Sequence, residues 1–182
     1  MALSANLERL SYGAPAGCVA PGMHREVVTV AASTTLTAEQ SGALVLLGVA
    51  SGATLTLPAP AEGMQFDVSV SVSRTSNSYK IITNAASVFL LGAYMAGDAT
   101  IATSGDIFTL DGATHVALTI DGDTKGGLVG GHLRFTCISA TQWYVEGLVV
   151  GTDYKKELFV ITIELLQRSV AIKLEGFQIE KV

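Results

Sequence analysis

Residues 27–72 constrain the fold of this chain more than any other feature. They read VVTVAASTTLTAEQSGALVLLGVASGATLTLPAPAEGMQFDVSVSV, a series of short β-branched runs separated by Ser-Gly and Pro-Ala-Pro turns. Val and Thr are enriched in strands, and no part of the stretch has the length and period of an amphipathic helix. The stretch also contains no His, Cys, Lys or Arg. It therefore favours a protein that folds to present surface, structural or binding, over an enzyme.

The β pattern continues to about residue 150 and predicts ten strands. Turn signals such as Ser-Gly and Asp-Gly recur between the runs, and many short strands at such spacing predict an antiparallel β-sandwich or barrel. No internal repeat of fixed period is present. The expected strands are residues 26–31, 43–49, 53–57, 64–73, 79–83, 87–91, 106–110, 115–120, 131–139 and 142–149.

The clearest alternation lies in FDVSVSVS. Phe66, Val68, Val70 and Val72 point to one face, while Asp67 and the serines point to the other. This pattern predicts a strand with one buried and one solvated face.

The two ends of the chain differ in composition from the middle. Residues 1–25 contain two prolines among Gly and Ala without periodicity, so we expect an N-terminal arm, followed by a β domain over 26–154. Residues 155–182 form a C-terminal extension, where β-branched residues favour a hairpin turning near 167–169. A break at Gly176 is consistent with a β-bulge. Leu165 and Leu166 fit a helix equally well, and that alternative stays open.

The composition predicts self-association. Hydrophobic residues make up 49% of the chain and charged residues only 15%, against a usual charged share of about 25%. No apolar run has the ~18 residues of a membrane span, and the N-terminus does not resemble a secretory signal. The excess apolar surface therefore predicts a homo-oligomer that forms through an apolar face of the β domain. The net charge of -5 provides no electrostatic footprint for nucleic acid, and no membrane partner is expected.

Motifs that could carry chemistry depart from their patterns. Residues 121–126 (DGDTKG) resemble a calcium loop, but Lys125 stands where an oxygen ligand is needed and His132 where the final Glu belongs, so a loop between strands is expected. The run GGLVGG at 126–131 does not match a phosphate-binding G-x-G-x-x-G and is interpreted as a mobile hairpin tip. His24 and His115, like His132, have no partner at metal-ligand spacing.

Other single residues are expected to have structural roles. Cys137 alternates with core positions and predicts a buried thiol, while a disulfide with Cys18 stays open. Trp143 and Val145 should pack inward and Tyr144 should face outward, where an aromatic ring could stack on sugar. Five acids are expected in turns, capping backbone groups: Asp98, Asp106, Asp111, Asp121 and Asp123. No cofactor, no metal and no catalytic activity are expected.

The order of three segments resembles small phage virion proteins, especially capsid decoration (cement) proteins. The segments are TLTAEQSGALVLL, SGATLTLPAPAEGMQFDVSV and ATQWYVEGLVVG, and the resemblance covers about residues 29–151. Similar strings also occur in tail-fibre and other virion modules, and residues after 153 depart from the pattern. The matching positions are Ser41, Gly42, Thr56, Leu57, Pro58, Pro60, Gly63, Phe66 and Trp143.

The resemblance implies an all-β, usually trimeric protein that docks on the outside of an icosahedral head and clamps neighbouring capsomers. Its partners would be the major capsid protein and itself, and its location the virion exterior after assembly in the host cytoplasm. One alternative is a receptor- or glycan-binding module of a tail or head fibre, which should place Trp or Tyr beside acids or amides in a groove. Another is a small β-fold enzyme. A cement protein should instead have flat apolar patches and ordered arms.

Both arms carry apolar residues that need a partner to be buried. Strand addition to a neighbouring sheet is the mode expected for the C-terminal extension. The predicted partner-binding residues are Leu7, Leu10, Tyr12, Val19 and Met23 in the N-terminal arm, and Phe159, Ile161, Ile163, Val170, Ile172 and Leu174 in the extension.

Overall fold

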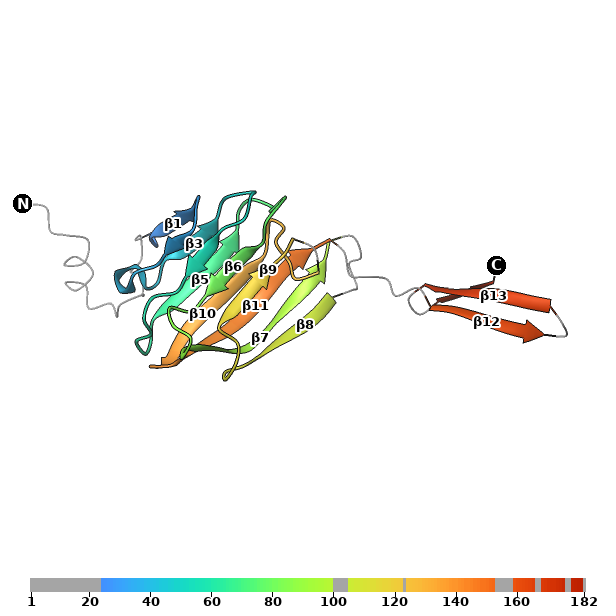
Figure 1. Cartoon of the computed structure of the whole chain (residues 1–182). Helices are drawn as coiled ribbons and strands as arrows, with labels where there is room; N and C mark the ends of the chain where they lie inside the picture. Colours follow the sequence, from blue (N-terminus) through green and yellow to red (C-terminus); the bar gives the residue numbers. More distant parts are fainter. Residues whose placement is uncertain are drawn as a thin grey trace, which may run out of the picture.

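The protein is almost entirely β. The computed structural model describes residues 24–99, 105–122 and 124–152, together with the backbone of three C-terminal strands within 159–181 (Figure 1). Within these residues, the one helical element is the 3-10 turn η1 (Ala38–Gln40). The expected all-β class is therefore confirmed.

The strands form three sheets. The largest has the order β1 (Val27–Val30), β3 (Leu44–Leu47), β5 (Gln65–Val70), β10 (His132–Ser139), β11 (Gln142–Gly151), β7 (Phe89–Asp98), β8 (Gly105–Asp111). The second has the order β2 (Thr34–Thr35), β4 (Thr54–Thr56), β6 (Tyr79–Ile82), β9 (Ala117–Ile120). The third contains β12 (Phe159–Leu165), β13 (Arg168–Glu175) and β14 (Gln178–Lys181).

Both larger sheets are mixed, which differs from the antiparallel arrangement expected from the sequence. The first six strands alternate between the two sheets, so that β1, β3 and β5 are parallel neighbours in one and β2, β4 and β6 in the other. The turns at Ser51-Gly52 and Pro58–Pro60 therefore carry the chain from one sheet to the other instead of closing hairpins. Each return to a sheet then runs in the same direction as before, which makes those pairings parallel.

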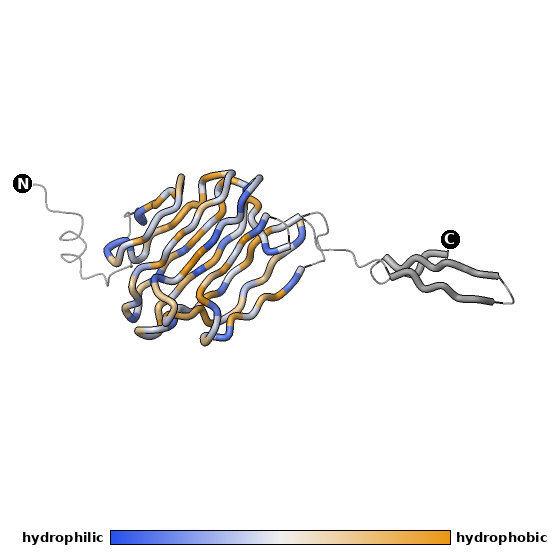
Figure 2. The backbone as a smooth tube through the Cα atoms, viewed as in Figure 1, coloured by the Kyte–Doolittle hydropathy of each residue, from blue (hydrophilic) through white to orange (hydrophobic). Residues whose placement is uncertain are grey.

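The alternating pattern buries one side of each larger sheet in a single apolar cluster. Figure 2 shows hydrophobic and hydrophilic residues alternating along the strands, and the buried side chains of both sheets belong to one core. Phe66, Val68 and Val70 are buried as predicted, but Val72 is 37% exposed. Its backbone N–H bonds the Leu47 carbonyl after β5 has ended, so the alternation stops at Val70.

Two aromatic side chains fix the core. The ring of Trp143 in β11 is fully buried, and its centroid lies 5.9 Å from that of Phe66. Tyr79 in β6 is also fully buried, and its hydroxyl donates to the carbonyls of Val49 (2.6 Å) and Val72 (2.9 Å). Burial raises the pKa of Tyr79 while the hydrogen bond to Val49 opposes the rise. This hydroxyl ties the loops after β3 and β5 to the second sheet.

The C-terminal extension forms the predicted hairpin, with a difference at its end. β12 pairs antiparallel with β13, and Arg168 and Ser169, which were expected in the turn, already belong to β13. The bulge expected at Gly176 falls outside the described residues, and β14, which follows in the chain, pairs antiparallel with β13. The backbone register places the six predicted partner residues in three directly opposed pairs: Phe159 with Leu174, Ile161 with Ile172, and Ile163 with Val170.

Candidate functional site

The outer face of the seven-stranded sheet, which points away from the core, carries a row of exposed apolar side chains. Leu148 of β11 pairs with Met95 of β7, which pairs with Ile107 of β8. These side chains are 49%, 51% and 67% exposed. Because the three positions are in direct register on adjacent strands, the side chains lie side by side on a regular sheet surface.

This outer face holds most of the exposed large hydrophobic side chains of the described residues. Eight such side chains are exposed: Val27, Val72, Met95, Ile107, Val129, Ile138, Tyr144 and Leu148. Five of the eight occupy outward positions on β1, β7, β8 and β11, and the remaining three lie after β5, in the β9–β10 loop and near the end of β10. Exposed apolar residues scattered singly are ordinary, whereas a contiguous group marks an interaction surface.

A buried carboxylate lies at the centre of the same face. Asp67 occupies an outward position on β5, yet it is only 3% exposed. Its Oδ2 accepts a hydrogen bond from Arg25 Nη1 (2.6 Å) and its Oδ1 from Arg134 Nε (2.8 Å). The prediction that Asp67 faces solvent is therefore wrong, because the two guanidinium groups cover it from neighbouring segments.

The two arginines determine the ionisation of Asp67. Burial raises the pKa of its carboxyl, but the hydrogen bonds and positive charges of Arg134 and Arg25 outweigh that effect, so the pKa lies below its usual value. The reciprocal contact raises the pKa of Arg134. Arg25 also donates to the carbonyls of Gly42 (2.8 Å) and Ala43 (3.1 Å). The residue that ends the predicted N-terminal arm is thus anchored at this face.

One polar arrangement on this face could be compared with a catalytic triad. It consists of Ser69, His132 and Asp67. Ser69 Oγ lies 2.9 Å from His132 Nδ1, and His132 Nε2 lies 3.5 Å from Asp67 Oδ1. A nucleophilic triad needs a carboxylate that orients the imidazole through a hydrogen bond. Here the carboxylate is already bonded to two arginines, and its distance to the imidazole is longer than a hydrogen bond. The geometry supports a surface polar network better than a catalytic one.

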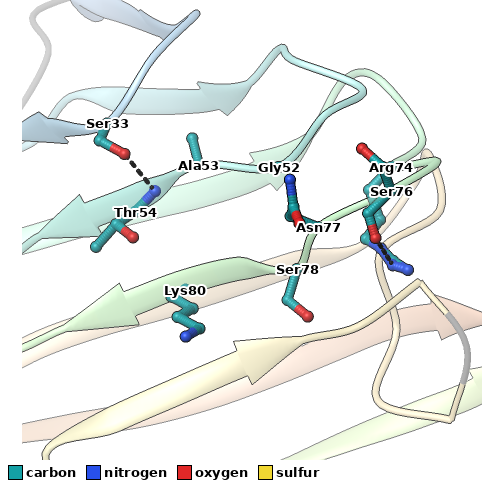
Figure 3. Close-up of a pocket in the computed structure, with 9 residues that line it drawn as sticks. All are labelled: Ser33, Gly52, Ala53, Thr54, Arg74, Ser76, Asn77, Ser78 and Lys80. Atoms are coloured by element: carbon teal, nitrogen blue, oxygen red, sulfur yellow. Dashed lines mark hydrogen bonds between the residues drawn. The ribbon is translucent and has the colours of Figure 1, made fainter.

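The outer face of the four-stranded sheet is different and holds a polar cavity of about 610 Å³. Figure 3 shows Ser33 and Thr54 at one end of the cavity and Arg74 with Ser76 at the other. Among the described residues, no aromatic side chain and no acid line it. The lining residues are Ser33, Gly52, Ala53, Thr54, Arg74, Ser76, Asn77, Ser78 and Lys80. A second, smaller cavity of about 200 Å³ lies beside Phe108 and Lys125.

The acids and glycines of the loops behave partly as predicted. Asp111 accepts hydrogen bonds from the backbone N–H groups of Ala113 and Thr114, and Asp121 accepts one from Lys125, so both cap turns. Hydrogen bonds from Thr114 chiefly hold the pKa of Asp111 well below its usual value. Asp98 and Asp106 differ from the prediction because they lie within strands β7 and β8.

The glycine-rich run at 126–131 is not a hairpin tip. It crosses from β9 in one sheet to β10 in the other, and Gly126 and Gly127 are buried. Its backbone is also bonded, with Leu128 N–H donating to Val150 (2.9 Å) and Arg74 N–H donating to Gly127 (3.0 Å). A Cβ at Gly126 would lie 2.4 Å from Val149 Cβ, so the run is glycine-rich because it is packed closely.

Some of the remaining predicted positions are described by the structure, and others lie outside the described residues. Cys137 is a buried free thiol with a pKa raised by burial, Trp143 and Val145 point inward, and Tyr144 is exposed. No three His, Cys, Asp or Glu side chains gather as a metal site within the described ranges. Outside the described residues lie Leu7, Leu10, Tyr12, Cys18, Val19, Met23 and Asp123, and the side chains of Phe159, Ile161, Ile163, Val170, Ile172 and Leu174.

Sequence reasoning missed the Arg25–Asp67–Arg134 cluster and the polar cavity. The only local signal for the cluster was an acid within an alternating strand, because its arginines come from segments distant in sequence. Comparison with protein-family models, curated proteins and solved structures found no match to this chain. Among the helices of the described part of the chain, none has the length and apolar character needed to cross a membrane.

Proposed function

We propose that this protein is a structural virion protein that binds the outer surface of a phage capsid and stabilises contacts between neighbouring capsomers. The outer face of the seven-stranded sheet would be its docking surface. The observation that carries this proposal is the concentration of exposed apolar side chains on that face, in the row Leu148, Met95 and Ile107. The resemblance of residues 29–151 to capsid decoration proteins suggests the partner, which is the major capsid protein.

The charges of this face are compatible with docking. Removing a charged group from water is unfavourable unless the group is paired. Arg25 and Arg134 share the carboxylate of Asp67, and Glu146 lies opposite Arg134 on β11, so covering the cluster removes no wholly unpaired charge from water. The apolar row beside the cluster would then supply the favourable burial, at roughly 25 cal/mol per Å² of apolar surface.

The arms would add to the same attachment. Arg25 binds at the docking surface, so the predicted anchor of residues 1–25 would begin there. The C-terminal strands would pair with another chain or with a second copy, through main-chain hydrogen bonds that need no special sequence. In this proposal the protein is a homotrimer, and its two larger sheets form a sandwich, because no strand of one pairs with a strand of the other in the described residues.

The test is the composition of purified virions, followed by particle binding of variants. Mass spectrometry of the virions should find this chain in fixed stoichiometry with the major capsid protein. Met95→Glu should weaken binding to undecorated particles by at least about tenfold, because a buried unpaired carboxylate is unfavourable at an interface. Thr35→Glu is the matched control, since its exposed side chain lies on the four-stranded sheet. Absence of the chain from virions would refute the proposal.

The alternative is a receptor- or glycan-binding module of a tail or head fibre, and the polar cavity favours it. Its lining includes the amide of Asn77 and several hydroxyl groups, which suit a hydroxylated ligand. No Trp or Tyr of the described part of the chain lines the cavity, so a neutral sugar would lack the stacking surface that was expected for a glycan binder. Equal particle binding by Met95→Glu and the wild-type protein would favour this alternative.

A further inference from the structure

The polar cavity on the four-stranded sheet combines two features that point to a ligand: unpaired positive charge and a fixed shape. The structure describes five Arg and Lys side chains, of which Arg25 and Arg134 are paired with Asp67. Of the other three, Arg74 and Lys80 both line this cavity. The chain as a whole has a net charge of -5, so this convergence of positive charge is local.

Among the described residues, no carboxylate forms an ion pair with Arg74. Its Nη1 donates to the carbonyl of Ser76 (3.0 Å), and its buried Nε has no hydrogen-bond partner in the described structure. Its stem is packed, because a Cβ at Gly122 would lie 2.7 Å from both Arg74 Cγ and Nε. A guanidinium that is partly removed from water and bonded only to neutral groups gains from a bound anion.

The walls of the cavity are fixed by backbone contacts. Thr75 N–H donates to the Ala50 carbonyl (2.7 Å), Lys80 N–H to Ala53 (2.9 Å), and Thr54 N–H to Ser33 Oγ (3.1 Å). Gly52 has a φ of +77°, and a Cβ there would lie 2.3 Å from the Asn77 carbonyl oxygen. The loop after β5 therefore lies directly against the turn before β4, and the cavity needs no rearrangement to exist.

The functional groups around the two cations define the ligand class. Ser33, Thr54, Ser76 and Ser78 contribute hydroxyl groups and Asn77 an amide, all of which can bond hydroxyls of a ligand. Arg74 and Lys80 can bond a carboxylate. We propose that this cavity binds an acidic saccharide, a sugar that carries a carboxylate group. The charges replace the aromatic stacking that a neutral sugar would need.

This proposal deepens the binding alternative and does not require capsid docking. The core lies between the inner sides of the two larger sheets, so the cavity and the docking surface are on different outer faces. A protein attached through the seven-stranded sheet would leave the cavity open. Lys80→Gln should accordingly bind particles as the wild-type protein does, so failure of one proposal leaves the other intact.

The experiment is isothermal titration calorimetry of the full chain with trigalacturonic acid. A parallel titration uses neutral maltotriose. We expect the acidic sugar to bind at least about tenfold more tightly than maltotriose, since a charge-assisted hydrogen bond is lost with the neutral sugar. Lys80→Gln should weaken this binding by about tenfold, and Arg74→Gln by a similar or larger factor. Lys125→Gln, which removes the same charge beside the other cavity, should leave it unchanged.

Each result decides the proposal. Lys80 is exposed, so its replacement tests the site even if Arg74→Gln fails to fold, because the Arg74 stem packs on Gly122. Equal affinity for maltotriose, or equal weakening by Lys125→Gln, would overturn the role of the two cations. Inorganic phosphate or sulfate bound as tightly as trigalacturonic acid would reveal a simple anion site and overturn the saccharide. No detectable binding of any probe would overturn the site altogether.

Discussion

The outer faces of the two larger sheets arise from the same alternation of residues, yet they carry different side chains. On the seven-stranded sheet, the outward positions of β11, β7 and β8 hold Leu148, Met95 and Ile107. On the four-stranded sheet, threonine is the commonest outward residue, and none of the exposed large hydrophobic side chains lies there. The inward positions of both sheets are equally apolar because they share one core. The outward positions are free of that requirement, so the two faces can differ in what they bind, as proposed above.

The two faces also differ in whether their positive charges are paired with acids. Arg25 and Arg134 on the first face share the carboxylate of Asp67, whereas Arg74 and Lys80 on the second have no acid beside them among the described residues. The first face therefore suits contact with a protein surface that excludes water, and the second suits attraction of an anion. The comparison predicts that substitutions on one face leave the function of the other intact.

The largest effect is expected from a substitution in the core, which should impair the binding of both faces. Trp143→Ala should destabilise the fold by about 3–5 kcal/mol, because it empties the fully buried site beside Phe66. Urea unfolding followed by circular dichroism measures the change. Both particle binding and sugar binding should fall in parallel, since they depend on the same core.

The neighbouring residue is the control for this prediction. Tyr144 lies on the same strand but is 39% exposed on the outer face, so Tyr144→Ala should cost less than about 1 kcal/mol. A loss from Tyr144→Ala as large as that from Trp143→Ala would show that the outer face is part of the core, which would break the comparison between the faces.

A smaller effect is expected from the buried carboxylate. Asp67→Asn should destabilise the fold by about 1–3 kcal/mol, because Arg25 and Arg134 lose a charged acceptor. The loss should stay below the ~3–5 kcal/mol of a fully buried pair, since both guanidinium groups remain partly solvated. Urea unfolding near neutral pH measures the change in the free energy of unfolding. No loss would mean that the cluster does not contribute to stability.

The pH dependence of stability follows from the same contact. The pKa of Asp67 is lower in the folded state, so the unfolded chain binds more protons in the acid range and stability rises with pH. The contribution is fully present above the unfolded pKa of about 3.9 and is lost as the pH falls through the folded value. Asp67→Asn should therefore lose less stability than the wild-type protein between neutral pH and about pH 3. An unchanged acid loss in the variant would contradict the assignment.

Asp67 also shows where sequence reasoning ends. The alternation around Phe66 predicted the strand and its buried side, and nine further strand positions were predicted near their observed places. The same pattern placed Asp67 in water, because a period of two reports only the side of the sheet. Its burial depends on Arg25 and Arg134, which arrive from other parts of the chain through sheet pairing. Pairing between distant segments is not encoded in local periodicity.

The sheet topology could not be predicted from the sequence for a related reason. A turn signal such as Ser51-Gly52 predicts that the chain bends, but it does not tell whether the next strand joins the same sheet or the other one. The chain takes the second course through its first six strands, which makes the pairings parallel and brings Arg74 and Lys80 to one cavity. The exposed row at Met95 was missed because β7 extends to Asp98, beyond the predicted end at residue 91.

The exposed carboxylate at the end of β8 offers a weaker counterpart to Asp67. Asp111 is bonded to Thr114 and to nearby backbone N–H groups, and these contacts lower its pKa. Asp111→Asn should reduce stability, but less than Asp67→Asn, because water can replace the lost contacts at an exposed turn. Thermal unfolding of the two variants side by side measures the order. The reverse order would show that the turn before β9 stabilises the sheet more than the cluster on its outer face does.

The smallest expected effect on stability is at Ile107, and it separates binding from folding most sharply. Ile107 is 67% exposed on β8, which ends the seven-stranded sheet, so Ile107→Thr removes little buried area and should change stability by no more than about 0.5 kcal/mol. The same substitution should reduce self-association or particle binding, because it removes the most exposed member of the apolar row. Sedimentation velocity and urea unfolding of the same preparation measure both quantities, with Thr35→Val as the reciprocal change on the other sheet. If Ile107→Thr instead destabilised the isolated chain by more than about 1 kcal/mol while association stayed intact, the row would belong to the fold. The contrast between the two outer faces would then reflect packing, and the docking surface would have to be sought elsewhere.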